Sequence, residues 1–180
     1  MFKDNRFDDF STLTLEESTK YDKKLKSKDV TPKHVIQIGE SIYPNEKEFE
    51  LNTPQTYQRL EGEDFLLEVE YFYTSKDSSI KVILYQWNFY HTEDQKVREL
   101  TDTEIKKKYE KFDKKFNYLR TKLTKKLGEP SDIEINSKNS EINFRDGIKW
   151  IGDNNPKAYL FMFGNNNNQY RQIGLAIYSE

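Results

Sequence analysis

The 180-residue sequence contains no cysteine. This absence excludes disulfides, thiol catalysis, cysteine-ligated zinc and iron–sulfur clusters. Only 7 residues are glycine, and neither a Gly-x-x-x-x-Gly-Lys-Ser/Thr run nor a Gly-x-Gly-x-x-Gly run occurs, which disfavours a phosphate-cradling nucleotide loop. No stretch approaches the ~20 apolar residues of a membrane-spanning helix. We therefore predict neither a bound cofactor nor a membrane span.

An excess of charge of one sign is also lacking. Lys and Arg number 29 and Asp and Glu number 31, so the formal net charge is −2. Such a balance gives no general attraction to nucleic acid, which we disfavour as a partner. Residues 1–6 lack the apolar core of a signal peptide. We expect a cytoplasmic protein, with an exported mature chain whose signal has been removed as the alternative.

Aromatic residues are abundant. They make up 14% of the chain, with 12 Tyr and 12 Phe, although apolar residues as a whole reach only 34%. The core must therefore be built largely from rings, which bury much area per residue. A chain of this length buries roughly two-thirds of its unfolded surface without a staple. Because no low-complexity linker divides it, we predict a single domain over residues 1–180.

The clearest local pattern predicts a helix over residues 101–127. Thr101 and Glu104 form a capping box. Apolar residues then recur at alternating steps of four and three, which draws one stripe along a helix. Gly128 supplies a C-cap and Pro130 prevents continuation. Three rings in this stripe favour packing on a sheet over a coiled coil.

Alternating apolar residues predict two β-hairpins. One joins strands over residues 65–73 and 81–87, and the other joins strands over 158–163 and 170–178. A further strand is predicted over 148–151, and Ile133 and Ile135 suggest a short one. Polar residues suited to turns separate the paired strands.

The first third of the chain has weaker patterns. Thr14 and Glu17 form a second capping box, which opens a polar helix to about residue 25. Residues 35–43 are predicted as a strand, 49–51 as a brief one and 52–62 as a loop. The fold class is therefore α+β, with an antiparallel sheet of six to eight strands that carries both helices. Halves 1–95 and 96–180 could be a degenerate internal repeat, although ordinary α+β alternation explains the same pattern.

No motif predicts catalysis or metal binding. The two histidines, His34 and His91, lack the spacing of a zinc site, and the potential ligands at residues 92–94 do not supply it. Ser41 follows Gly39-Glu40 but lacks the second glycine of a hydrolase elbow. We therefore lean towards a protein that is not an enzyme. A carboxylate-based hydrolase stays open, since it requires only two carboxyls in unlike surroundings.

The uneven distribution of charge is the most informative feature. Residues 106–126 of the predicted helix are rich in lysine, which predicts a basic outer face, whereas residues 40–70 are acidic. An acidic surface can dock a basic protein, although a solvated face is the simpler explanation. The candidate docking residues are Glu46, Glu48, Glu50, Glu68 and Glu70. Alternation places Glu68 and Glu70 on the solvated face of their strand.

Large aromatic residues suggest a second kind of site. Tyr85 and Trp87 share one face of a predicted strand, and Trp150 lies in another. Core packing is the simpler explanation. A pocket between helix and sheet lined by these rings would instead suit a flat small ligand, which is not excluded as a partner.

These observations favour a non-catalytic binding protein, such as an inhibitor, that docks another protein through its acidic surface. Small bacterial immunity and inhibitor proteins share this general character, although no motif of such proteins occurs here. A small-ligand module and a carboxylate-based hydrolase are the alternatives.

Overall fold

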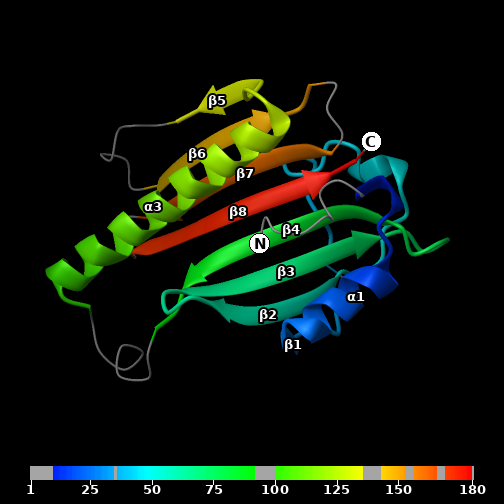
Figure 1. Cartoon of the computed structure of the whole chain (residues 1–180), viewed down its shortest axis with the longest axis horizontal. Coiled ribbons are helices and arrows are strands. Elements are labelled where there is room, and N and C mark those ends of the chain that lie inside the picture. Colours follow the sequence, from blue (N-terminus) through cyan, green and yellow to red (C-terminus); the bar gives the residue numbers. More distant parts are fainter. Residues whose placement is uncertain are drawn as a thin grey trace.

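The computed structural model describes residues 10–34, 36–91, 100–135, 143–152, 156–165 and 169–179. It is an α+β fold with one antiparallel eight-stranded sheet, as the sequence predicts. Figure 1 shows the long helix α3 running along the strands of the C-terminal half. Within the described ranges, neither helix combines the length and the apolarity that a membrane crossing demands.

The helices and strands follow one another in a simple order. The helices are α1 (Leu15–Lys24) and α3 (Asp102–Leu127), with short 3-10 turns η2 (Phe10–Thr12) and η3 (Glu46–Glu48). The strands are β1 (Lys28–Asp29), β2 (Gln55–Glu61), β3 (Phe65–Tyr73), β4 (Ile80–Phe89), β5 (Asp132–Glu134), β6 (Asn143–Trp150), β7 (Lys157–Asn165) and β8 (Tyr170–Tyr178).

Both predicted capping boxes are present. Thr14 Oγ1 accepts from the Glu17 N–H at the start of α1, and Thr101 Oγ1 accepts from the Glu104 N–H at the start of α3. In each box the glutamate carboxylate also accepts from the N–H of the threonine. These contacts satisfy N–H groups that a helix leaves without an internal partner. The two helix starts are therefore set by the sequence.

The strand order of the sheet is mirrored about its centre: the first four strands follow the order of the chain and the last four follow it in reverse. Strands run β1-β2-β3-β4-β8-β7-β6-β5, so each half supplies one helix and four consecutive strands. The halves meet where β4 pairs antiparallel with β8, from Val82 opposite Tyr178 to Asn88 opposite Gln172. This arrangement has the symmetry that a repeat of residues 1–95 in 96–180 would produce. Whether it arose by duplication stays a prediction.

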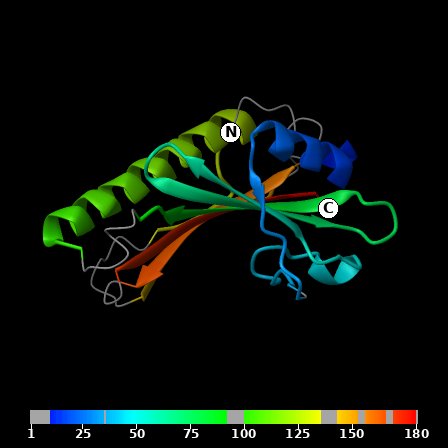
Figure 2. The ribbon, with the colours of Figure 1, turned by 90° about the horizontal axis from the view of Figure 1, so that it is seen from below.

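Both helices cover the same face of the sheet, which we call the helix face (Figure 2). The apolar side chains of this face form the larger core, around Trp87, Phe112 and Leu160. We call the opposite side the far face. Residues 36–51, the crossing segment, run along part of it, and Ile38 and Tyr43 pack there against Phe72 and Tyr178. The far face therefore has only a partial cover from the described chain.

Two expectations for the first third are wrong. Residues 52–62 are not a loop, because residues 55–61 form β2 and pair with β3 along their whole length. Described residues between 36 and 43 form no strand, because this stretch crosses the far face and turns back at Gly39, whose carbonyl accepts from the Tyr43 N–H. The stretch 49–51 makes only an isolated bridge from Leu51 to Thr74.

Candidate functional site

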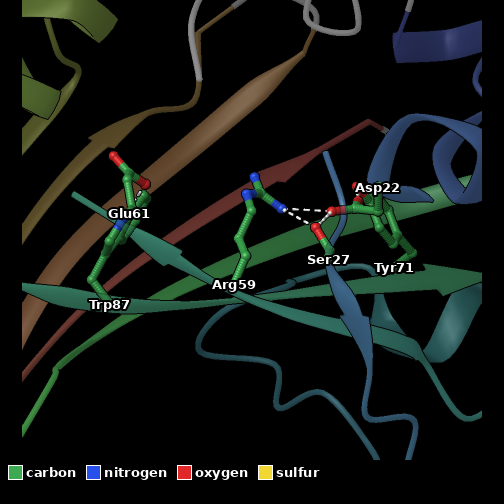
Figure 3. Close-up of polar contacts among 6 residues, drawn as sticks. All are labelled: Asp22, Ser27, Arg59, Glu61, Tyr71 and Trp87. Atoms are coloured by element: carbon green, nitrogen blue, oxygen red, sulfur yellow. Dashed lines mark hydrogen bonds and ion pairs between the residues drawn. The ribbon is translucent and has the colours of Figure 1, made fainter. Parts of the chain in front are cut away.

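A buried carboxylate lies between α1 and the sheet. Asp22 on α1 has no exposed surface, and Arg59 on β2 donates to its Oδ1 at 2.5 Å. Ser27 Oγ donates to the same oxygen at 2.7 Å, and the hydroxyl of Tyr71 donates to Oδ2. Figure 3 shows these four side chains converging from α1, the turn that follows it, β2 and β3. The carboxylate is fully paired, so this cluster anchors α1 to the sheet.

A second ion pair lies under α3. Lys115 forms a salt bridge with Glu61 on β2. The indole N–H of Trp87 donates to the other oxygen of Glu61 at 2.8 Å, and these two side chains are drawn in Figure 3. Burial acts to raise the pKa of Glu61, but the hydrogen bond and charge of Lys115 outweigh it and leave that pKa lowered. Lys115 Nζ also lies 5.0 Å from the centroid of the Trp87 ring. Glu61, like Asp22, therefore has a cation as a direct partner.

Two further carboxylates lie on the far face. Glu68 and Glu70 on β3 are two residues apart and share a face, with Glu70 only 6% exposed and Glu68 half-buried. Gln86 on β4 donates to Glu70 at 2.9 Å, and Gln58 on β2 donates to Glu68 at 3.4 Å. In the part of the chain that the structure describes, neither glutamate has an ion-pair partner.

Burial changes how these two groups ionise. Burial and the negative charge of Glu68 together raise the pKa of Glu70 to about 7, against the opposing hydrogen bond from Gln86. Burial also raises the pKa of Glu68, against the hydrogen bond from Gln58. On the helix face, Asp22 and Glu61 each form an ion pair with a cation, whereas no described cation pairs with Glu68 or Glu70. We therefore take Glu68 and Glu70 as the candidate functional site.

The C-terminal half of the far face carries cations beside aromatic rings. Arg145 on β6 lies over the rings of Tyr159 and Phe161, at 5.7 and 5.6 Å from their centroids. Lys149 Nζ lies 5.3 Å from the Tyr159 centroid. A Cβ at Gly174 would collide with the Phe161 ring, so the ring lies directly over that glycine on β8. The far face thus has the Glu68–Glu70 pair in one half and, in the other, Arg145 and Lys149 beside aromatic rings, with Lys149 also 3.6 Å from Asp132 on β5.

The predicted docking residues do not form one patch. Leu51 bridges Thr74, so the stretch holding the exposed Glu48 and Glu50 lies at one end of β3. Glu68 lies six residues before Thr74, which is roughly 20 Å along an extended strand. The expectation that Glu70 is solvated is also wrong. The side chain of Glu46 lies outside the described part of the structure.

The aromatic residues proposed to line a pocket belong to the core. Tyr85, Trp87 and Trp150 are 5%, 0% and 2% exposed. The rings of Tyr85 and Trp87 stack at 6.0 Å, and the Trp150 indole N–H donates to the Gly128 carbonyl at 3.0 Å. Three surface pockets are formed by described residues of α3, of α1 with the β3–β4 turn, and of the crossing segment. None of these three pockets includes the three rings, so the small-ligand alternative gains no support from them.

The basic face predicted for α3 is only partly solvated. Lys108 is 6% exposed and donates to the Gln169 carbonyl at 2.8 Å, and Lys115 pairs inward with Glu61. Lys111 pairs with Asp64. Lysines of this helix therefore tie it to the ends of the sheet. The long apolar stem of a lysine packs against the sheet while its ammonium group reaches a buried or half-buried partner.

No group of metal ligands occurs among the described residues. His34 is exposed and His91 half-buried, with the His91 ring 5.3 Å from that of Phe89. The potential ligands at residues 92–94 lie outside the described ranges, as do the turn residues 153–155 and 166–168.

The sequence did not predict the clusters around Asp22 and Glu61. Their polar residues lie in stretches interpreted as a solvated helix and a loop. One signal was present, because Tyr57, Arg59 and Glu61 alternate and so share one strand face. A charged residue on such a face becomes buried when a counter-charge from a distant element meets it.

The fold and these clusters define an α+β protein with an antiparallel sheet and two helices on one face. The far face is partly covered and carries Glu68 and Glu70 in one half and Arg145 and Lys149 in the other. Comparison of the chain with protein-family models, curated proteins and solved structures gave no match. The functional argument therefore depends on the geometry alone.

Proposed function

We propose that the protein is a non-catalytic binding protein that docks a protein partner of basic surface on its far face, around Glu68. The carrying observation is that no described cation pairs with Glu68 or Glu70, whereas the fully buried Asp22 and the half-buried Glu61 each have one. An acidic pair held in place by amides is complementary to a lysine or arginine of a partner. Such charge complementarity gives docking its specificity and its speed.

The geometry favours Glu68 as the direct contact. Glu68 is half-buried, so a cation can reach it, whereas Glu70, two residues further along the same strand face, is only 6% exposed. A cation on Glu68 also stabilises ionised Glu70, whose pKa is raised towards 7 by burial and by Glu68 itself. Binding would therefore be accompanied by release of a proton near neutral pH. An inhibitor or immunity-type protein would use such a preformed face.

The test is an affinity capture from native lysate at low and high salt, with wild-type protein and two charge reversals. Glu68→Lys places a cation on the proposed contact. Glu48→Lys makes the same change at an exposed glutamate of the crossing segment and is the matched control. We expect one stoichiometric partner that dissociates at high salt, is lost with Glu68→Lys and is kept with Glu48→Lys. A partner retained by Glu68→Lys, or no partner, contradicts the proposal.

A carboxylate-based hydrolase is the second candidate, favoured by the unlike burial of Glu68 and Glu70. Burial holds the pKa of Glu70 at about 7, where a general acid works best, beside a more exposed carboxyl. A panel of chromogenic esters, glycosides and phosphoesters tests it. Turnover that is lost in both Glu70→Gln and Glu68→Gln supports the hydrolase, and absence of turnover across the panel counts against it.

A further inference from the structure

Two buried cations lie together on the helix face, away from the far face. Lys108 on α3 is 6% exposed and Arg171 on β8 is 7% exposed. Among the described residues, these are the two basic side chains buried to this degree. Burial and the positive charge of Arg171 both lower the pKa of Lys108. The two charges are therefore close enough to repel each other.

Arg171 is held by rings. Its guanidinium carbon lies 3.6 Å from the centroid of Tyr109 and 5.0 Å from that of Phe144. Stacking on rings uses the faces of the guanidinium and leaves the N–H groups in its plane for other partners. Gly164 permits this packing, because a Cβ there would lie 2.7 Å from the Phe144 ring and 3.0 Å from Arg171 Cγ.

The in-plane N–H groups of Arg171 are only partly satisfied. Nη1 contacts Asp113 Oδ1 at 3.4 Å, which is long for a charge-assisted hydrogen bond, and the Asp113 side chain is 55% exposed. Nε is buried and has no hydrogen-bond partner in the described structure. A buried donor without an acceptor is costly and rare in folded proteins.

Lys108 is also short of acceptors. Its ammonium group has three donors, and among the described residues its one hydrogen bond goes to the carbonyl of Gln169 at 2.8 Å. It lies 5.5 Å from the centroid of the Phe89 ring. Among the described residues, Arg171 thus has only the long contact to the largely exposed Asp113, and no carboxylate pairs with Lys108, whereas Arg59 and Lys115 each have a closer carboxylate partner. Buried charge without a counter-charge is unfavourable, so this site favours an anion.

We propose that Lys108 and Arg171 form an oxyanion-binding site that takes a carboxylate or a phosphate group. The planar guanidinium binds either group through two parallel N–H···O bonds, and its unpartnered Nε supplies one of them. Lys108 supplies the second positive charge as a mobile point charge. The site is independent of the proposed docking at Glu68, because it lies on the opposite face of the sheet.

The first test is thermal melting in inorganic phosphate, in acetate and in chloride at one fixed ionic strength. Saturable stabilisation by phosphate or by acetate beyond that in chloride supports the site, and the more effective anion tells which group it takes. Isothermal titration with the same two anions measures the dissociation constant. Equal melting temperatures in all three salts, with no heat of binding, overturn the proposal.

Three variants make the assignment specific. Lys108→Met keeps the length of the side chain and removes the charge, and Arg171→Lys keeps the charge and removes the fork. Lys114→Met makes the first change at an exposed lysine of α3 and is the control. We expect at least tenfold weaker anion binding for the first two and no change for the third. Equal weakening by Lys114→Met would show nonspecific attraction to the helix.

A stability comparison covers the case in which binding is too weak to titrate. Lys108→Met removes a buried, uncompensated charge, so without phosphate it should melt at the same or a higher temperature than wild type. At high phosphate the order should reverse, because only the wild type gains from the anion. A variant that melts lower by the same amount in both conditions would show that Lys108 serves packing alone.

Discussion

Arg59 and Asp22 are 37 residues apart in sequence, and Arg59 Nη1 lies 2.5 Å from Oδ1 of the fully buried Asp22. This contact joins the first helix to the second strand of the sheet. It lies on the same strand face as Glu61, so β2 presents two inward charges, one to each helix. The stability of the helix layer therefore depends on polar as well as apolar contacts.

Removal of Arg59 should destabilise the protein strongly. In Arg59→Met the buried carboxylate of Asp22 keeps only its hydroxyl partners, and breaking a buried pair in this way costs about 3–5 kcal/mol. Lys20→Met removes the exposed partner of Glu16 and is the matched control, with little or no expected change because water screens an exposed pair. Urea unfolding measures both free energies. Similar losses in the two variants would show that burial of the pair is unimportant.

Glu70 should make the protein less stable as the pH rises towards neutrality. Its folded pKa, about 7, exceeds the ordinary value of 4.5, so between these pH values the folded state binds a proton that the unfolded state has released. The free energy of unfolding should fall over this range by up to about 3 kcal/mol and then level off. Glu68, whose pKa burial also raises, adds a change of the same sign.

Glu70→Gln should remove most of this pH dependence, because the amide carbonyl can still accept from Gln86 and carries no charge. The variant should be more stable than wild type at pH 8 and similar to it near pH 4. Glu48→Gln is the control and should follow the wild-type profile. Urea unfolding across pH 4–8 decides, and an unchanged slope in Glu70→Gln would show that another group is responsible.

Gly174→Ala should strain the centre of the far face. The new Cβ would collide with the Phe161 ring, and overpacking of this kind costs typically about 1–3 kcal/mol. Phe161→Leu combined with Gly174→Ala should recover part of the loss, which a double-mutant cycle measures. Gly152→Ala is the control, since nothing lies within 4 Å of its added Cβ. An additive cycle would show that the ring and the glycine do not interact.

Thr101→Ala should destabilise α3 by about 1 kcal/mol, because the alanine cannot accept from the Glu104 N–H. The same substitution at Thr121, an exposed interior position of the same helix, removes only a bond to the Asn117 carbonyl. It should be neutral or slightly stabilising, since alanine is the better helix former. Thermal unfolding of both variants checks the contrast, and equal losses would argue against the cap.

The sequence was a good guide wherever local chemistry decides the structure. The capping boxes at Thr14 and Thr101 and the alternation in β3, β4, β7 and β8 correspond to the structure within a few residues. β2 was missed because its charged residues resemble a loop until Asp22 and Lys115 are brought to them from distant elements. The same limit hid the burial of Glu70, which follows from cover on both faces of β3 and not from alternation.

The candidate site was predictable in part. Glu68 and Glu70 were selected for their charge, but their separation from Glu48 and Glu50 depends on where the crossing segment meets Thr74. The burial of Lys108 could not be predicted, because nothing in the sequence distinguishes a lysine that points towards the sheet from the solvated lysines of the same helix. Such distinctions depend on tertiary contacts that no local pattern contains.

The mirrored strand order has a consequence for how the chain folds. The centre of the sheet is the seam between β4 and β8, where Asn88 and Gln172 meet although 84 residues separate them. During synthesis the edge of β4 is exposed from the time it leaves the ribosome until the last of the eight strands arrives. Pairings this distant form slowly, and an open apolar edge can recruit the wrong neighbour. The interval before β8 emerges is therefore when the nascent chain is most open to mispairing.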